Sequence, residues 1–295
     1  MKLTYINVKI RQIQNINNAE KRVNSMRIIN WEEFLLPYEQ AVNELRLKLE
    51  AVAHQYKVVK KHCPISQVES RVKSVGSIIA KMNKKGISMD DIEEGIDDIA
   101  GVRVICRFVE DIERVLDLLK KRESFDLKIL QEKDYINNTK PSGYRSYHVV
   151  IEYPVMTHEG VKNLKAEIQI RTMAMNFWAT IEHSLKYKYN GNIPEAVQQR
   201  LITSAEAAFN LDKEVSTIRD EITEAQKIVK IVDETVEEIL SNLQGLYGSA
   251  KLDNINELNK KFIEVYQLED VDKLLNFAEQ VRVIGDIYKS RYYKE

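Results

Sequence analysis

The sequence predicts a helix-rich α+β protein, in which helices flank one mixed β-sheet and a long helical extension follows at the C-terminal end. Two observations predict this class. Glycine and proline are scarce, at 10 and 5 of 295 residues, which favours long helices with few tight turns. Segments with strand periodicity occur in one block, and helical periodicity stands before and after it.

The first third of the chain contains two predicted helices. Residues 1–30 are polar and mildly basic, and we expect them to form an N-terminal arm. From Trp31 to about Tyr56, apolar residues recur at steps of three and four, which predicts an amphipathic helix. A second helical stretch is expected from about Ile65 to Met82, with lysine and arginine residues concentrated along it and just beyond its end.

The central block reads as four strands, at about 99–108, 126–136, 146–156 and 164–172, with a helix at about 111–121 between the first two. In the last strand, alternate residues face opposite sides of the sheet. One side is apolar, and the other is wholly polar: Lys165, Glu167, Gln169 and Arg171. A polar face is either a solvated surface of the sheet or the floor of a site.

From Pro194 onward the pattern is helical. Between Leu211 and Leu246, apolar residues alternate steps of four and three over five heptads, which predicts coiled-coil-like packing, within the subunit or between subunits. Two further amphipathic helices are expected around Leu258 to Leu268 and Val271 to Tyr288.

Composition limits the classes of function. The net charge of −1 lacks the basic balance of a generic nucleic-acid binder, so any anion site must be local. No apolar run approaches the roughly 20 residues that cross a bilayer, and no signal-peptide pattern opens the chain, so we expect a cytoplasmic protein without membrane contact. Cys63 and Cys106 match neither a zinc spacing nor a disulfide framework, and we expect two reduced thiols.

Charged and aromatic residues gather around the predicted strands. Asp98 stands at the head of the first strand, Arg103 lies on it, and a donor-rich turn with Tyr144 precedes His148 on the third. Carboxylates beside cations and an aromatic ring suit a nucleotide polyphosphate bound with a divalent metal ion. Asp98 and Glu167 could bind that metal, and Glu167 is the candidate base for a hydroxyl acceptor. Because no G-x-x-x-x-G-K loop is present, side chains must hold the phosphates.

Four motifs stand in order along the chain: R-V-K-x-x-x-S (Arg71 to Ser77), D-I-A-G-V-R (Asp98 to Arg103), S-G-Y-R-S-Y-H (Ser142 to His148) and E-I-Q-I-R-T (Glu167 to Thr172). They resemble the synthetase domain of RelA/SpoT homologues. Two further segments, Trp31 to Leu49 and Asn176 to Ser184, are similar to the small RelQ-type alarmone synthetases. The resemblance runs from about Trp31 to Gln226. It implies a nucleotidyltransferase-like synthetase domain at 31–226 and a helical extension at 227–295.

The resemblance also implies roles for individual residues. Mg²⁺ would bind Asp98 and Glu167, with Glu167 also activating the acceptor 3′-hydroxyl. Arg71 and Arg103 would stack on the two faces of the ATP adenine. The ATP phosphates would contact Lys73, Ser77 and Lys81.

On the acceptor side, the resemblance implies a site for GDP or GTP. Tyr144 would stack on guanine and Asn176 would contact its edge. Ribose and phosphates would contact Lys140, Arg145, His148 and Gln169. The alternative to these binding roles is structural: Tyr144 could simply be an aromatic residue of a turn, and Asn176 a hydrogen-bonding residue of a helix. For His183 we prefer such a structural role.

The activity implied is transfer of the β,γ-pyrophosphate of ATP to the 3′-hydroxyl of GDP or GTP, which gives ppGpp or pppGpp and AMP for stringent-response signalling. No hydrolase is implied, because none of the five histidines precedes an aspartate. Adenine nucleotides or tRNA 3′ ends are alternative acceptors, and a catalytically dead, helical RNA-binding module is an alternative of another class.

The resemblance to RelQ-type enzymes implies a homotetramer that an alarmone product activates. Single-stranded RNA is a further candidate regulator. Arg46 stands in the matching helix, but Glu50, Gln67 and Glu69 replace the groups expected at the activator site. Added carboxylates would repel a polyphosphate, which leaves product activation open.

Overall fold

The structure is a computed structural model, and it describes residues 30–123, 125–188, 194–247 and 252–292. The predicted arm at 1–30 lies outside the described residues except for Asn30. The chain divides into two compact units, of which the first ends at Glu214 and the second begins at Val215. Among the described helices, none combines the length and the apolar composition needed to cross a bilayer.

Five strands form one mixed sheet in the first unit, in the order β1-β2-β5-β4-β3. Their bounds are β1 Gln67–Val72, β2 Ala100–Cys106, β3 Lys128–Asp134, β4 Tyr147–Thr157 and β5 Gly160–Thr172. Strands β2 and β5 run parallel, and the other neighbours pair antiparallel. The predicted mixed sheet is therefore confirmed.

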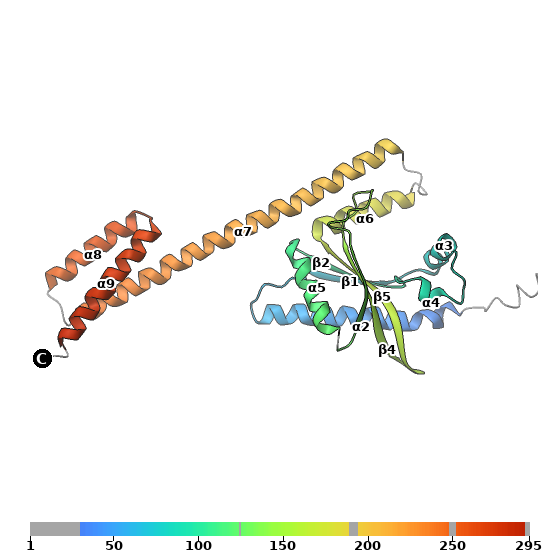
Figure 1. Cartoon of the computed structure of the whole chain (residues 1–295), viewed down its shortest axis with the longest axis horizontal. Helices are drawn as coiled ribbons and strands as arrows, with labels where there is room; N and C mark the ends of the chain where they lie inside the picture. The colour runs from blue at the N-terminus through green and yellow to red at the C-terminus, as the bar shows by residue number, and fades with distance from the viewer. Residues whose placement is uncertain (1–29, 124, 189–193, 248–251, 293–295) are drawn as a thin grey trace, which may run out of the picture. The chain divides into compact units, whose positions relative to one another are not determined.

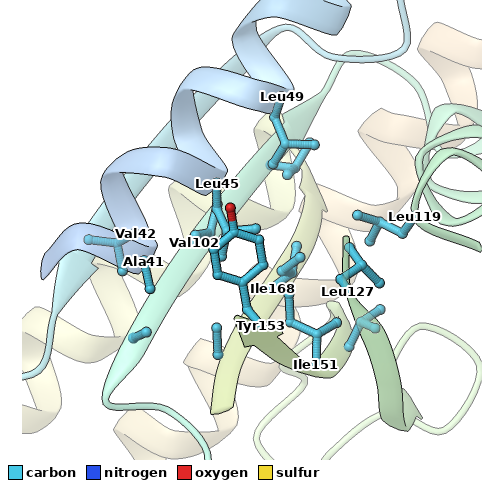
Figure 2. Packing of buried hydrophobic residues seen from close by; sticks show 14 of the residues in the cluster. Ala41, Val42, Leu45, Leu49, Val102, Leu119, Leu127, Ile151, Tyr153 and Ile168 are labelled. Atoms are coloured by element: carbon cyan, nitrogen blue, oxygen red, sulfur yellow. The ribbon is translucent and has the colours of Figure 1, made fainter. Parts of the chain in front are cut away.

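Helices α2 (Trp31–Val58) and α5 (Glu110–Arg122) pack their apolar residues against one face of this sheet (Figure 1). Figure 2 shows the layer in which Leu45 and Leu49 of α2 meet strand residues such as Val102, Ile151 and Ile168. These five side chains are at most 2% exposed. Because strand residues alternate in direction, the opposite face presents the polar residues of β5.

The predicted helix from Ile65 to Met82 is wrong in its first half, where the chain forms β1. A separate helix, α3 (Val75–Lys85), begins after Ser74, whose side chain accepts a hydrogen bond from the Ser77 amide. Short segments carry too few residues for local periodicity to separate strand from helix. Antiparallel pairing with β2, over 25 residues away along the chain, makes this segment a strand. A short helix, α4 (Ile92–Gly95), precedes Asp98.

Helices α6 (Met173–Lys188) and α7 (Glu195–Leu246) follow the sheet. The start of α7 packs against α6 and the turn before β4. The Trp178 indole donates to the Leu201 carbonyl at 3.1 Å. Gly143 has φ +84°, and a Cβ there would lie 2.6 Å from that of Ala205, so the turn requires glycine at this position.

Asp212 of α7 is a buried carboxyl that accepts a hydrogen bond from the Thr172 hydroxyl at 2.5 Å. Burial raises its pKa to about 6, although the Thr172 hydrogen bond opposes this. An unfolded aspartate loses its proton near pH 4. The folded protein keeps the proton to about pH 6, so the free energy of unfolding falls as pH rises between these two values.

We expect Asp212→Asn to remove this dependence, since the amide oxygen still accepts from Thr172. The free energy of unfolding should rise by about 2–3 kcal/mol at pH 8 and stay nearly unchanged at pH 3.5. Urea unfolding at both pH values checks this, with the exposed Asp117→Asn as control. An equal gain at both pH values would contradict the titration.

The second unit consists of the later part of α7 with α8 (Leu252–Gln267) and α9 (Val271–Tyr292). The two amphipathic helices predicted at the C-terminal end are therefore confirmed. The heptad prediction is met only in part within the chain. Ile239, Leu243 and Leu246 are buried among residues of α8 and α9, whereas Leu211 and Ile222, earlier in the same repeat, are 57% and 53% exposed.

Candidate active site

A cleft of about 630 Å³ lies over the polar face of the sheet, where β1, β2, β4 and β5 contribute side chains and α3 and α6 border it. Nine predicted site residues line it: Arg71, Lys81, Asp98, Arg103, Lys140, Tyr144, His148, Glu167 and Gln169. A larger cavity of about 890 Å³, beside the start of α2 and the β4–β5 turn, contains none of the predicted site residues. The chemistry therefore points to the smaller cleft.

Asp98 is held by two lysines. Its Oδ2 accepts from Lys73 Nζ at 2.9 Å and its Oδ1 accepts from Lys81 Nζ at 2.8 Å. Burial opposes ionisation of this carboxyl, but the hydrogen bonds and charges of Lys81 and Lys73 outweigh burial and lower its pKa. Asp98 is thus a carboxylate at neutral pH, with both oxygens occupied by ammonium groups.

Glu167 belongs to a closed ring of five hydrogen-bonded side chains. Its Oε1 lies 3.0 Å from His148 Nδ1, and its Oε2 accepts from the Gln169 amide at 2.6 Å. The other imidazole nitrogen lies 2.7 Å from the Tyr144 hydroxyl. Arg171 Nη2 closes the ring by donating to Tyr144 at 2.5 Å and to Gln169 Oε1 at 2.6 Å.

This ring determines the ionisation of Glu167. Burial would raise its pKa, but the hydrogen bond and charge of His148 and the hydrogen bond of Gln169 outweigh burial, so the pKa is lowered. The negative charge of Asp98 acts in the opposite direction, which places the two carboxylates within electrostatic reach of each other. Glu167 is therefore an ionised, oriented proton acceptor.

Cations and an aromatic pair surround the carboxylates. Lys140 Nζ lies 4.2 Å from the ring centroid of Tyr135 and 4.6 Å from that of Tyr144, and burial lowers its pKa. On the other side, Arg71 and Arg103 come from neighbouring strands, and Arg103 lies 3.5 Å from Glu69. The site can hold anionic phosphates between two separate groups of cations.

Comparison with known proteins identifies this arrangement. A family model described as a region found in RelA / SpoT proteins matches residues 70–192. The chain is 52% identical over 196 residues to the GTP pyrophosphokinase YjbM of Bacillus subtilis, covering 66% of this chain and 92% of the relative. The chain belongs to the RelA/SpoT family.

Solved structures of this family have the same fold in their matched parts. The small alarmone synthetase 1 from Bacillus subtilis bound to its product pppGpp is 51% identical, with a TM-score of 0.64, and the match covers 65% of this chain and 98% of that one. The same synthetase bound to AMPCPP is 48% identical, with a TM-score of 0.59, over 66% and 98%. About a third of this chain lies outside each match.

Four residues that the RelA/SpoT resemblance implicated do not line the cleft. Lys73 contacts it only through Asp98, and Ser77 stands at the start of α3, where its hydroxyl lies 2.8 Å from that of Ser74. Asn176, on α6, has a buried side-chain oxygen without a hydrogen-bond partner in the described part of the chain. Arg145 lies away from the cleft in this structure: its guanidinium lies over the Phe209 ring, 4.3 Å from the centroid.

The turn that precedes β4 explains the position of Arg145. Successive residues there point in opposite directions, so Tyr144 contacts His148 while Arg145 Nη1 donates to the Ala205 carbonyl of α7 at 3.4 Å. Arg145 therefore holds the turn against α7.

Sequence reasoning missed other residues that line the cleft. Strand alternation placed Arg171 on the polar face of β5 with Glu167, but sequence reasoning assigned it no role of its own. On α6, Glu182, His183 and Lys186 line the cleft, and their spacing of one helical turn was the available signal. The preferred structural role for His183 is wrong, because this side chain is exposed at the cleft. Tyr135 follows β3 and carried no signal.

Proposed function

We propose that this chain is a GTP pyrophosphokinase. The acceptor's 3′-oxygen forms a bond to the β-phosphorus of ATP, the bond from that phosphorus to the α,β-bridging oxygen breaks, and AMP leaves. GDP gives ppGpp and GTP gives pppGpp, the alarmones of the stringent response. The observation that carries the proposal is the presence of Asp98 and Glu167 in one cation-lined cleft. The names of the relatives favour guanine nucleotides over adenine nucleotides or tRNA as acceptors.

Glu167 is the proposed base for the acceptor hydroxyl. A base must be ionised and held within hydrogen-bond reach of the proton it takes. The lowered pKa keeps Glu167 ionised at neutral pH, and its bonds to His148 and Gln169 fix its direction.

Asp98 and Glu167 fit Mg²⁺, which prefers one or two carboxylates together with substrate phosphate oxygens. When bound there, Mg²⁺ would neutralise charge on the transferred pyrophosphate. The protein's own contribution is electrostatic. Lys73 and Lys81 now occupy both oxygens of Asp98, and ATP phosphates would draw these ammonium groups away and uncover the carboxylate.

The lysine pair predicts that nucleotide-free protein binds divalent metal weakly. We expect Lys73→Met with Lys81→Met to tighten Mn²⁺ binding at least tenfold without nucleotide, about 1.4 kcal/mol, because two competing cations leave Asp98. Titration of free Mn²⁺ by electron paramagnetic resonance measures this directly. The control removes two exposed lysines elsewhere, Lys84→Met with Lys121→Met. An equal gain in the control would show that only net charge matters.

For the donor, we propose that Arg71 and Arg103 enclose adenine, since planar guanidinium groups stack on π-faces. Lys73, Ser77 and Lys81 would contact the phosphates.

For the acceptor, we propose that guanine stacks on Tyr144 and that Lys140, His148 and Gln169 contact ribose or phosphates. The unpaired oxygen of Asn176 suits the N–H donors of the guanine edge. Arg145 is left out of this site because it contacts α7.

The direct test is chromatography of products from ATP and Mg²⁺ with GDP, GTP, GMP, ADP or tRNA supplied separately. We expect AMP together with a 3′-pyrophosphorylated guanine nucleotide. A product only with ADP or tRNA would replace the acceptor, and no AMP with any of them would overturn the enzymatic function.

Assembly and regulation extend this proposal by resemblance. A homotetramer acting in the cytoplasm, where ATP and GTP are available, fits the RelQ-type pattern, and single-stranded RNA is a candidate regulator. Alarmone activation is not part of the proposal, because Arg46 Nη1 pairs with Glu50 at 3.1 Å.

A further inference from the structure

One apolar face of α7 is uncovered in the described part of the second unit. Every residue from Asp220 to Ile231 is exposed. Five apolar residues recur here at the first and fourth heptad positions, and we call them the α7 stripe: Val215, Ile218, Ile222, Ala225 and Val229. Four of them are 38%, 45%, 53% and 59% exposed, at Val215, Ile218, Ile222 and Val229 respectively.

The stripe continues an apolar face that is buried further along the same helix. Ile239, Leu243 and Leu246 extend the repeat and are at most 2% exposed against α8 and α9. The outward side of the stripe segment already has its own ion pairs, such as Lys227 with Glu224 at 3.2 Å. Most helical stability in proteins comes from packing of an apolar face, and the apolar face of this segment has no such packing within the described part of the chain.

We propose that the α7 stripe packs against the α7 stripe of a second copy of this chain, as a parallel two-stranded coiled coil. The first heptad position, a, carries Val215, Ile222 and Val229, and β-branched residues occupy this position in parallel two-stranded coils. Ile218 and Ala225 fill the fourth position, d. The partner's matching face is the stripe itself, since a two-fold interface is self-complementary.

The flanking charges fix the direction of the pair. In a parallel coil, each residue at position g faces position e of the next heptad in the other helix. Glu214 of one copy then faces Arg219 of the other, and Glu221 faces Gln226, so no like charges meet. An antiparallel coil sets position g against position g, and the registers that bring Glu214 opposite Glu221, or Glu221 opposite its own copy, would place like charges together. Arg219 already pairs with Asp220 within its own chain. Glu214 of the other copy would therefore add a second carboxylate to an existing ion pair.

Disulfide cross-linking in the full chain tests the proposal. Single substitutions Val215→Cys, Ile222→Cys and Val229→Cys place thiols on the coil axis, and Lys227→Cys places a matched thiol on the outward side. After mild oxidation, non-reducing electrophoresis should show at least ten times more covalent dimer for each axial variant than for Lys227→Cys. The unsubstituted chain gives the background from Cys63 and Cys106.

The pattern of cross-links also distinguishes the rival partners. An antiparallel pair would cross-link at no more than one of the three axial positions, which overturns the proposed direction. A different protein, or the α8–α9 pair of another copy, would leave all three at background and overturn the proposal.

A second variant separates pairing from folding. Adding Ile222→Glu to Val215→Cys places two carboxylates against each other in the coil, and cross-linking should fall to background. Adding Lys227→Glu to Val215→Cys should leave it unchanged. AMP release should be equal in both, which verifies that the first unit is folded. Undiminished cross-linking with Ile222→Glu would contradict the coil.

Discussion

Glu167→Gln is expected to lower the kcat for AMP release by about 10²–10⁴-fold, the range that a lost general base accounts for. Glutamine has the size of glutamate and keeps an oxygen that accepts a hydrogen bond, so the ring through His148 and Gln169 keeps most of its geometry. The substitution removes the proton acceptor and one ligand charge for the metal. Single-turnover AMP release and calorimetric binding of a non-hydrolysable ATP analogue should separate lost chemistry from retained binding.

Glu152→Gln is the matched control for this result. Glu152 lies on the same face of the sheet, opposite Lys165 of β5, but outside the cleft. Turnover of this variant should be within about twofold of the unsubstituted enzyme, since Glu152 is a half-buried side chain outside the cleft. Near-normal turnover in Glu167→Gln would overturn the assignment of the base.

Asp98→Asn is expected to lower kcat by about 10²-fold or more, because a lost metal ligand removes several kcal/mol of charge stabilisation. In the absence of metal, the affinity for ATP should stay the same or increase, because Lys73 and Lys81 lose the carboxylate that now binds them. The half-saturating Mg²⁺ concentration should rise. Measuring kcat across a Mg²⁺ titration, and ATP-analogue binding in a chelator, tests both parts.

The neighbouring carboxylate provides the control. Asp97 also lines the cleft but lies 3.6 Å from Lys165, away from the lysine pair. Asp97→Asn should leave the Mg²⁺ requirement unchanged. If Asp97→Asn matched Asp98→Asn, general loss of negative charge in the cleft would explain both variants, and Asp98 would not be a metal ligand.

Strand alternation explains how much of the site the sequence could predict. In β5 the period of two places Glu167, Gln169 and Arg171 on one face without further information. The same rule failed for β1, because six residues pair with a strand far along the chain and local periodicity cannot detect that pairing. In the turn before β4, alternation agrees with the opposite directions of Tyr144 and Arg145, but the contact of Arg145 with Ala205 of α7 depends on tertiary packing.

The sequence by itself determined the fold class, the apolar core faces and most of the side chains that line the cleft, because side-chain periodicity and residue type are local properties. Only the tertiary structure decided which of these groups meet. The strand order β1-β2-β5-β4 brings Arg71, Asp98, Glu167 and His148 into one cleft, and docking of α8 and α9 covers only the last part of the α7 repeat. Both depend on contacts between residues distant in the chain, which no local pattern specifies.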